Sequence, residues 1–397
     1  MSVPSLSQLI EIGKQAIDKC SDALNEVSQQ IWNEPELAFE EKNAHFVLTS
    51  FFESQGFQVS KQTPLETSFI AKYGPDDGVK VGVMCEYDAL PGIGHACGHN
   101  LIAEAGAAAA IGLKAILEAN PSIKAQVVAF GTPAEEGGGG KIDMIEKGCF
   151  DDMDFCMMSH PTPFDSVIFQ CLATCQLKVV YHGKEAHAAA CPWVAKNALD
   201  AAVQCYNNAS MLRQQMLPSC RIHGVILDGG VKPNIIPQRS ELHWYIRGPK
   251  ASIRDELKER FLGCVHGAAS ATGCTVEVDV LDKPYSDIKE APTLNSLYKK
   301  HAESLGVVFP DLEKLPIKDM AASTDMGNVS YVKPSIHPIF RIGDVMNHTL
   351  EFTKAAGLPE AQGPTLKSGK AMMMVAIEVL TSDTLLKKIK EEFLSTS

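Results

Sequence analysis

The chain has 397 residues, of which 45% are hydrophobic and 21% are charged. This composition is typical of a globular protein and excludes collagen-like, coiled-coil and disordered chains. The 36 basic and 48 acidic residues give a net charge of −12, which argues against nucleic acid as a partner and is compatible with a cationic substrate. We also expect no membrane partner, because no uninterrupted apolar run is long enough to span a bilayer.

The twelve cysteines carry information about location. The first residues contain Glu11 before any basic residue and lack an apolar core, so we expect no signal peptide. Most of the thiols are therefore expected to be reduced, buried core residues of a cytoplasmic protein. No Cys-x-x-Cys pair is present, which gives no indication of a zinc ribbon or a thioredoxin-type site.

The first 170 residues alternate between helical and strand patterns. Helices are expected over Leu6–Ile31, Glu41–Gln55, Leu101–Leu117 and Lys141–Lys147, and strands over Phe57–Ser60, Ser68–Tyr73, Val79–Glu86, Ala125–Phe130 and Phe155–Ser159. The stretch Val81–Cys85 is apolar throughout, as in a central strand buried on both faces. This alternation predicts an α/β fold with a mostly parallel central sheet flanked by helices.

The pattern changes between residues 171 and 284. Its elements follow the order strand, helix, strand, strand, helix, strand, which is the ferredoxin-like βαββαβ unit. We expect this stretch to be a lid domain inserted into a discontinuous catalytic domain formed by residues 1–170 and 285–397. After the insertion, helices are expected at about 293–304 and 366–393.

Three polar segments directly follow predicted buried strands. The first contains Cys97 and His99, the second contains Glu135 and Glu136, and the third contains His160. Because open α/β sheets bind ligands beyond the carboxyl ends of their strands, we expect these side chains to meet at one edge of the sheet. Each segment alone is weak evidence, but together they predict a metal site with thiolate and imidazole ligands.

The adjacent glutamates indicate what such a site does. A divalent metal lowers the pKa of a water molecule, and a nearby carboxylate carries the proton to the leaving amine. A closed structural zinc site would not need that second carboxylate. Amide hydrolysis is therefore favoured. A thiol mechanism that uses Cys97 and His99 is the alternative, although two residues on one tight loop are poorly placed as a nucleophile–base pair.

Several strings resemble the dinuclear metallopeptidases that include aminoacylase, glutamate carboxypeptidase, auxin-conjugate amidohydrolase and bacterial aminobenzoyl-glutamate hydrolase. Within this family the sequence is most similar to the branch of the Xaa-Arg dipeptidase, also called β-alanyl-lysine dipeptidase. The resemblance covers residues from about 20 to 380 and implies a zinc-peptidase-like fold. The strings are Glu86-Tyr-Asp-Ala-Leu-Pro, Gly94-His-Ala-Cys-Gly-His-Asn, Pro133-Ala-Glu-Glu, Ser159-His-Pro, Tyr181-His-Gly-Lys-Glu-Ala-His-Ala, Asn197-Ala-Leu-Asp-Ala-Ala, Asn234-Ile-Ile-Pro and Ser323-Thr-Asp-Met.

The resemblance implies a role for particular residues. Glu135 would be the general base, and Asp88 would orient a metal ligand. His187 would reach the active site of a partner subunit, so a homodimer through the lid domain is implied. The metal ligands would be Cys97, in the bridging position, with His99, Glu136, His160 and His348, and the substrate-binding residues would be Asn234 and Arg247.

Two positions depart from the family pattern. Many relatives have a histidine ligand where this chain has Glu86, and the auxin-conjugate branch has aspartate where this chain has Asn100. The resemblance implies two divalent metal ions. Imidazole and thiolate ligands favour Zn²⁺, while a carboxylate at position 86 would move the preference toward Mn²⁺, and Co²⁺ is also compatible.

We therefore expect a metal-dependent dipeptidase that hydrolyses dipeptides with a basic C-terminal residue, namely β-alanyl or aminoacyl derivatives of Lys, Orn or Arg. One alternative is an amidohydrolase for N-acyl-amino acids or aminobenzoyl-glutamate. Another is a non-catalytic binding protein that kept the fold, although none of the expected site residues has been lost.

Overall fold

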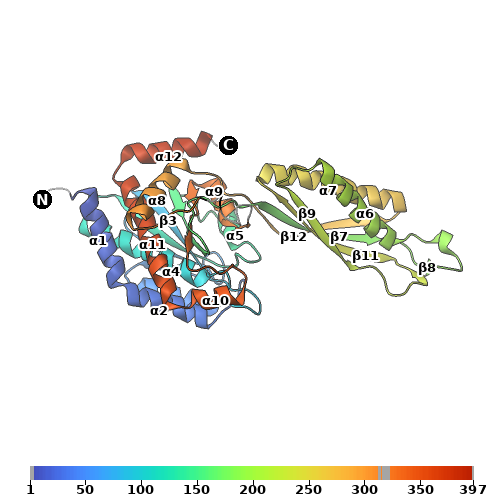
Figure 1. Cartoon of the computed structure of the whole chain (residues 1–397), viewed down its shortest axis with the longest axis horizontal. Helices are drawn as coiled ribbons and strands as arrows, with labels where there is room; N and C mark the ends of the chain where they lie inside the picture. The colour runs from blue at the N-terminus through green and yellow to red at the C-terminus, as the bar shows by residue number, and fades with distance from the viewer. Residues whose placement is uncertain (1–3, 312–313, 315–321, 396–397) are drawn as a thin grey trace. The chain divides into compact units, whose positions relative to one another are not determined.

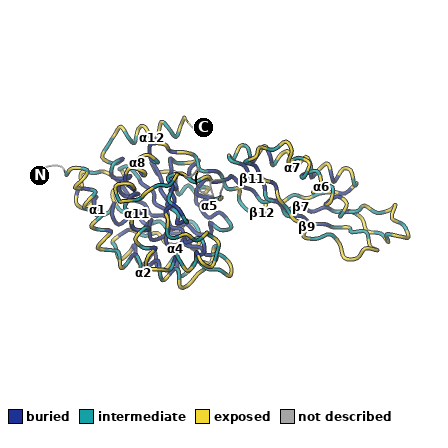
Figure 2. The backbone as a smooth tube through the Cα atoms, in the orientation of Figure 1, coloured by how far each residue is buried: buried dark blue, intermediate teal, exposed yellow. Residues whose placement is uncertain are grey.

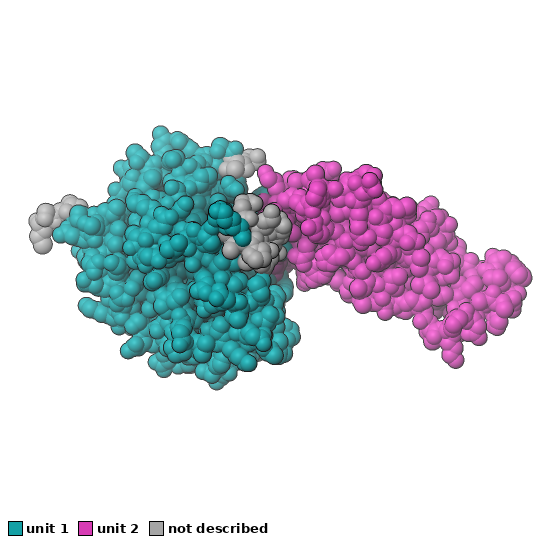
Figure 3. Space-filling model, viewed as in Figure 1, with its two compact units in different colours: residues 1–169, 288–397 teal, residues 170–287 magenta. Residues whose placement is uncertain are grey.

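The computed structural model describes residues 4–311, 314 and 322–395. The chain divides into two compact units (Figure 3). Unit 1 contains residues 1–169 and 288–397, and unit 2 contains residues 170–287. Each unit has its own hydrophobic core.

Unit 1 is built on a six-stranded sheet with the order β1-β2-β4-β3-β5-β13. Its strands are β1 (Gln58–Lys61), β2 (Phe69–Tyr73), β3 (Val79–Glu86), β4 (Ala125–Thr132), β5 (Phe155–Met157) and β13 (Ser335–Ile336). The strands from β4 to β13 are parallel, whereas β1 and β2 add an antiparallel edge. The expected mostly parallel α/β sheet is thus confirmed. A separate parallel pair joins β6 (His160–Thr162) to β14 (Ile339–Arg341).

Helices cover both faces of this sheet (Figure 1). They are α1 (Leu6–Lys19), α2 (Ser21–Asn33), α3 (Lys42–Ser54), α4 (His99–Ala119), α5 (Gly140–Glu146), α8 (Pro292–Ser304), α9 (Met326–Val332), α10 (Leu350–Ala356), α11 (Pro359–Leu380) and α12 (Asp383–Ser395). Successive residues of β4 serve opposite faces: Val127 packs in the core with α4 and α11, and Val128 packs in the core with α5 and α9. Figure 2 shows the sheet as the buried centre of the unit.

Helix α4 carries one of the expected metal ligands, and its small residues let it pack closely on the sheet. Residues Ala107–Ala110 are all fully buried. At Gly106, an added Cβ would come within 2.3 Å of the carbonyl oxygen of Met84 in β3, so a larger residue would push the helix away from the strand. The helix is long and apolar enough to cross a membrane by composition, but 89% of that window is buried inside the protein.

Two expected helices are each divided in the structure. The stretch Leu6–Ile31 forms α1 and α2, which are separated at Cys20, where φ is −95° and ψ is 1°. The stretch 366–393 belongs to α11, which begins earlier at Pro359, and to α12. The single-helix interpretation was wrong because apolar residues recur at helical spacing on both sides of each break.

Unit 2 is a four-stranded antiparallel sheet with the order β12-β7-β11-β9. Its main elements are β7 (Ala173–His182), α6 (Ala198–Leu212), β9 (Arg221–Asp228), β11 (Arg239–Gly248), α7 (Ala251–Thr272) and β12 (Thr275–Tyr285). Helices α6 and α7 share a core with the sheet. A short ribbon pairs β8 (Ala186–His187) with β10 (Ile235–Ile236).

Candidate metal centre

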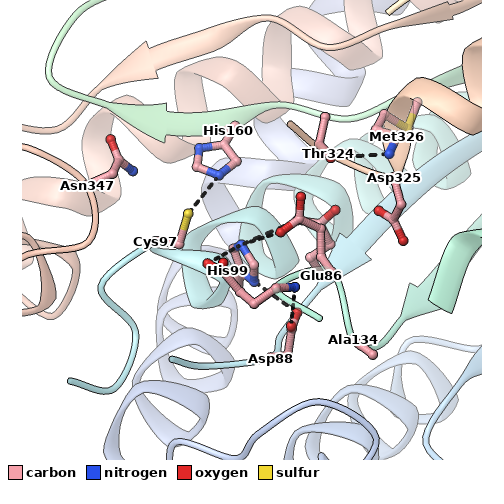
Figure 4. A network of polar contacts seen from close by, with 12 residues as sticks. Glu86, Asp88, Cys97, His99, Ala134, His160, Thr324, Asp325, Met326 and Asn347 are labelled. Carbon is pink, nitrogen blue, oxygen red and sulfur yellow. Dashed lines mark hydrogen bonds and ion pairs between the residues drawn. The ribbon is translucent and has the colours of Figure 1, made fainter. Parts of the chain in front are cut away.

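The polar segments that follow β3, β4 and β5 come together in unit 1 (Figure 4). Cys97 precedes α4, His99 is the first residue of α4, and His160 begins β6. Glu136 follows β4, and His348 lies in the loop before α10. Residues from distant parts of the sequence thus meet beyond the carboxyl ends of the parallel strands, where α/β sheets bind ligands.

The five expected ligands form two groups that share one cysteine. The ligand atoms of Cys97, His99 and His160 all lie within 4.8 Å of one another, and the same holds for Cys97, Glu136 and His348. The distance from Cys97 Sγ to His160 Nε2 is 3.3 Å, and the distance from His348 Nε2 to Glu136 Oε1 is 3.5 Å. A thiolate common to two three-residue groups is what a bridging ligand between two metal ions requires.

Gly98 makes this spacing possible. It adopts a φ of 77°, in the left-handed region, and directly precedes the first turn of α4. A Cβ at this position would lie 2.6 Å from Cγ of Pro161. Because only glycine tolerates both the backbone conformation and the contact, the Cys-Gly-His sequence is needed to place both ligands.

His99, which is buried, and His160, which is half-buried, present the same ring nitrogen to the cluster. His99 Nδ1 is 3.0 Å from Asp88 Oδ1, and His160 Nδ1 is 2.8 Å from the carbonyl oxygen of Pro161. Each contact places a proton on Nδ1 and directs Nε2 toward the cluster, which is the usual arrangement for metal-binding histidines. Burial lowers the pKa of His99, but the charge and hydrogen bond of Asp88 outweigh burial and raise it well above its ordinary value, so a metal ion that binds Nε2 must displace a proton. Burial and the nearby charge of His99 lower the pKa of His160 to about 3, so its imidazole is neutral, as a ligand must be.

Asp88 connects the two ligand groups. Its second oxygen, Oδ2, accepts a hydrogen bond of 2.8 Å from the backbone N–H of Glu136. The side chain is only 1% exposed, so these interactions are not shared with bulk water. Asp88 therefore orients His99 through one oxygen and the loop that carries Glu136 through the other.

The glutamate pair follows a strained turn. Ala134 has a φ of 60°, which is unusual for a residue other than glycine. Its N–H donates a 2.9 Å hydrogen bond to Glu41 Oε1, and the same buried carboxylate accepts hydrogen bonds from the Thr67 hydroxyl and the Phe39 N–H. Glu41 thus stabilises the turn that directs Glu135 and Glu136 toward the cluster.

The pKa values of the two adjacent glutamates are shifted in opposite directions. Burial raises the pKa of Glu136, but the hydrogen bond to His348 and the charge of His99 outweigh that effect and lower it overall. Burial and the charges of Glu86 and Glu136 raise the pKa of Glu135 well above its ordinary value. Two neighbouring carboxyl groups with divergent pKa values can divide the roles of ionised ligand and proton carrier.

The residues fit a divalent metal. His99 Nε2 is buried and makes no hydrogen bond within the part of the chain that the structure describes. Its nearest carboxylate oxygens, on Glu86, Glu136 and Glu135, are 3.6, 3.8 and 3.9 Å away. A buried nitrogen without a hydrogen-bond partner is costly unless another group, such as a metal ion, takes the lone pair. One thiol, three imidazoles and one carboxylate are ligands that Zn²⁺ and related ions accept.

Three expected substrate or catalytic residues lie in unit 2. His187 and Asn234 lie together, because His187 in β8 pairs with Ile235 in β10, and Ala188 N–H donates to the carbonyl oxygen of Asn234 at 3.0 Å. Both residues are exposed. His187 Nδ1 accepts two backbone N–H bonds of 3.2 Å, so its Nε2 carries the proton of the neutral ring.

Arg247 is not placed near these two residues within unit 2. It lies in β11 opposite Thr174, whereas Arg239, at the other end of β11, is opposite His182, from which the chain continues to β8. Arg247 lies eight residue steps along β11 from Arg239, which corresponds to about 26 Å. The Arg247 guanidinium lies 5.2 Å from the centre of the Tyr245 ring.

Sequence reasoning missed Lys141 and Glu41 and gave Asp325 no role. Lys141 is fully buried and contacts Glu86 and Asp325. Asp325 belongs to the Ser323–Met326 string that carries part of the family resemblance, which was the one available signal. A lysine after a glycine-rich loop is expected to be exposed, so nothing in the sequence pattern identified Lys141 as a buried residue.

Comparison with known proteins agrees with this geometry. Residues 82–358 match the description "Peptidase family M20/M25/M40". The chain is 45% identical to the Xaa-Arg dipeptidase of Mus musculus, with 99% of this chain and 94% of the relative covered. It is 28% identical to a component of the p-aminobenzoyl-glutamate hydrolase of Escherichia coli, with 95% and 93% covered.

A solved Bacillus subtilis structure, described as a dinuclear metal binding peptidase of the M20 family, superimposes with a TM-score of 0.69 at 19% identity, and covers 91% of this chain and 99% of its own. At that identity the likeness concerns the fold, which is the α/β architecture described above. The family match and the identity over nearly the whole chain go further and show a hydrolase that acts on peptide or amide bonds. The chain belongs to the peptidase family M20/M25/M40.

Proposed function

We propose that the protein is a dinuclear metal-dependent dipeptidase that releases a basic C-terminal amino acid, Lys, Orn or Arg, from β-alanyl or aminoacyl dipeptides. The observation that carries the proposal is the pair of ligand groups that share Cys97 beside Glu135. The preference for a basic residue is supported by the 45% identity to relatives named Xaa-Arg dipeptidase in mouse and human.

The residues around the cluster would divide the work. Cys97, His99, Glu136, His160 and His348 would hold two divalent ions, which when bound lower the pKa of water and polarise a carbonyl group. Glu135 would take the proton of the attacking water and deliver it to the leaving amine, and burial and the charges of Glu86 and Glu136 raise its pKa, which helps a carboxyl group to hold a proton between these two steps. Asp88 would keep His99 oriented.

We assign both metal positions to Zn²⁺, with Co²⁺ and Mn²⁺ as substitutes. The donors are one thiol, three imidazoles and a single carboxylate, a set that is too soft to favour Mn²⁺. Because a thiolate ligand is open to oxidation, we propose a reducing, cytoplasmic location for the protein.

Unit 2 would act as the lid and dimerisation domain. The Nε2–H group of His187 would donate a hydrogen bond to the scissile carbonyl oxygen of the substrate held by the other protomer and polarise it. The hydrogen bonds to Nδ1 favour the tautomer that carries its proton on Nε2. Asn234 and Arg247 would bind the substrate carboxylate, and because they lie far apart within unit 2 they would have to come from different protomers. A homodimer through this unit is supported by the edge strand β9 and helix α6, which expose the apolar residues Val203, Tyr206, Val225, Ile226 and Leu227.

One alternative keeps the chemistry and changes the substrate. The Escherichia coli relative named as part of a p-aminobenzoyl-glutamate hydrolase matches 95% of the chain, so an amidohydrolase for N-acyl-amino acids or aminobenzoyl-glutamate is the second candidate.

A thiol mechanism is disfavoured, because burial and the charge of Glu136 raise the pKa of Cys97 well above its ordinary value, whereas nucleophilic cysteines need a lowered one. Full turnover in excess chelator would reinstate it. A purely binding role has no observation in its favour, because the expected ligands and base are all present.

The test is a substrate panel. Protein loaded separately with Zn²⁺, Mn²⁺ or Co²⁺ is incubated with β-alanyl-lysine, aminoacyl-arginine, an N-acyl-amino acid and aminobenzoyl-glutamate. We expect release of the basic amino acid from the first two. Selective cleavage of the last two would favour the amidohydrolase, and no release from any substrate would contradict an enzymatic role.

A further inference from the structure

A buried group of three charged side chains borders the metal centre. This charge triad consists of Glu86, Lys141 and Asp325, which are all fully buried. The three residues come from the end of β3, the first turn of α5 and the N-terminus of α9. Figure 4 shows Glu86 beside His99, with Asp325 farther from His99. Nothing in the catalytic scheme above uses Lys141.

Lys141 is bound tightly by both carboxylates. Its Nζ donates to Glu86 Oε1 and, at 2.7 Å, to Asp325 Oδ1, and its backbone N–H donates to Asp325 Oδ2 at 2.9 Å. Burial alone would lower the pKa of Lys141, but the charges of Asp325 and Glu86 outweigh burial and raise it. A lysine that remains charged in a closed interior fixes the position of both carboxylates.

The other oxygen of Glu86 faces the metal ligands. Glu86 Oε2 lies 3.6 Å from His99 Nε2, and among the described residues it has no hydrogen-bond partner. The ligand atoms of Glu86, His99 and Glu135 also lie within 4.8 Å of one another. By position alone, Glu86 could therefore act as an additional metal ligand and change the character of the site.

We propose that Lys141 is a positioning residue that withholds Glu86 from the metal ions, so that the ions are bound by the thiolate, the imidazoles and Glu136 alone. The proposal rests on the dinuclear site proposed above. Its basis is geometric, because the ammonium group holds Oε1 of Glu86 and Asp325 holds the ammonium group. The consequence is metal selection: with Glu86 withheld, the donor set stays soft and favours Zn²⁺ over Mn²⁺.

The first experiment replaces Glu86 without disturbing its shape. Glu86→Gln is loaded with Co²⁺ and compared with the wild type by metal analysis and by visible absorption, which reports coordination number and thiolate ligation. We expect two metal ions per chain and an unchanged spectrum. Loss of one ion, or altered Co²⁺ bands, would show that Glu86 is a ligand and would overturn the proposal.

The second experiment removes the lysine. In Lys141→Met, Glu86 is no longer paired and can reach the metals, so Co²⁺ absorption should weaken as coordination increases. The ratio of Zn²⁺ to Mn²⁺ affinity should fall roughly 10- to 100-fold, the range typical of residues that support metal ligands. A folded Lys141→Met protein with wild-type spectrum and ratio would contradict the proposal.

A double variant separates structural from specific effects. Lys141→Met/Glu86→Gln has the same net charge as the wild-type triad but lacks the carboxylate at position 86, so it should recover the wild-type spectrum and metal ratio. If Lys141→Met does not fold, Glu86→Gln decides the question alone. Failure of wild-type protein to bind two divalent ions would instead contradict the proposed function, which distinguishes the two failures.

Discussion

The two units differ in whether their candidate site residues contact one another within the unit. In unit 1, Asp88 and His99 are enclosed and joined by a direct hydrogen bond. In unit 2, His187 and Asn234 are exposed on a short ribbon, and Arg247 lies elsewhere on the sheet. A site whose residues contact one another within one unit can be assigned from its internal geometry, whereas the exposed residues of unit 2 acquire a role only through groups outside their unit. The following experiments test that contrast.

The largest effect is expected at Glu135, a buried residue of unit 1. Glu135→Gln keeps the size of the side chain but removes the proton acceptor, so kcat should fall by roughly 10² to 10⁴ while bound metal stays at two ions per chain. Steady-state kinetics and metal analysis on the same sample measure both. Retained turnover with full metal content would exclude Glu135 as the base.

The next test asks whether the exposed ribbon serves the partner's site. His187→Ala and Glu135→Gln are each expected to be inactive as homodimers. In a mixed dimer, one site would combine an intact Glu135 with an intact His187 from the other protomer, so an equal mixture should recover about a quarter of wild-type activity. Absence of recovery after exchange of protomers, verified by mass, would contradict a role in trans.

A stability test examines the buried helix α4. Burial raises the pKa of Glu104 from 4.5 to about 7, and neither of its carboxylate oxygens has a hydrogen-bond partner among the described residues. The folded protein therefore keeps this proton after the unfolded chain has lost it, and stability is lost as the pH rises from about 4.5 through about 7. At a pH above about 7, Glu104→Gln should therefore raise the free energy of unfolding by up to about 3 kcal/mol relative to the wild type.

The measurement is urea unfolding at pH 4.5 and pH 8 in chelator, so that metal binding does not contribute. The stabilising effect of Glu104→Gln should be present at pH 8 and absent at pH 4.5. Glu259→Gln on the exposed surface of α7 is the matched control and should show no such difference. Equal behaviour of both variants would contradict a buried, protonated Glu104. Glu41, whose pKa burial and the charge of Asp88 also raise to about 7, should keep part of the pH dependence.

The smallest effect concerns the support of one ligand. Asp88→Asn can still accept a hydrogen bond from His99 but loses the charge, so metal affinity should fall roughly 10- to 100-fold without loss of fold. Competition with a chromogenic chelator measures the affinity, and thermal unfolding checks the fold. Unchanged affinity would show that the position of His99 depends on helix α4 alone.

Much of the site in unit 1 could be predicted from the sequence, because each ligand except His348 lies in a polar segment that follows a buried strand. The strand predicted at Val79–Glu86 matches β3, and this placement brought Cys97 and His99 to the correct edge. His348 came only from family resemblance, since its loop has no periodic pattern.

The supporting residues could not be predicted in the same way. Glu41 lies 93 residues before Ala134, the residue whose strained turn it holds, and Lys141 lies 184 residues before Asp325. Such pairs are created by tertiary packing, and a lysine or glutamate that is buried with a partner has the same local pattern as an exposed one. The break at Cys20 was also hidden, because the apolar face continues through it.

Helix α4 also limits how this chain can diverge. Gly106 lies against the backbone of β3. A larger side chain on this face of the helix would displace His99 and the Cys97 loop together, so the positions of these two ligands cannot change independently. The ribbon of unit 2, with exposed side chains on β8 and β10, carries no such constraint. If the ribbon contacts the substrate as proposed, substitutions in it would change substrate preference without disturbing the packing of α4 that holds His99.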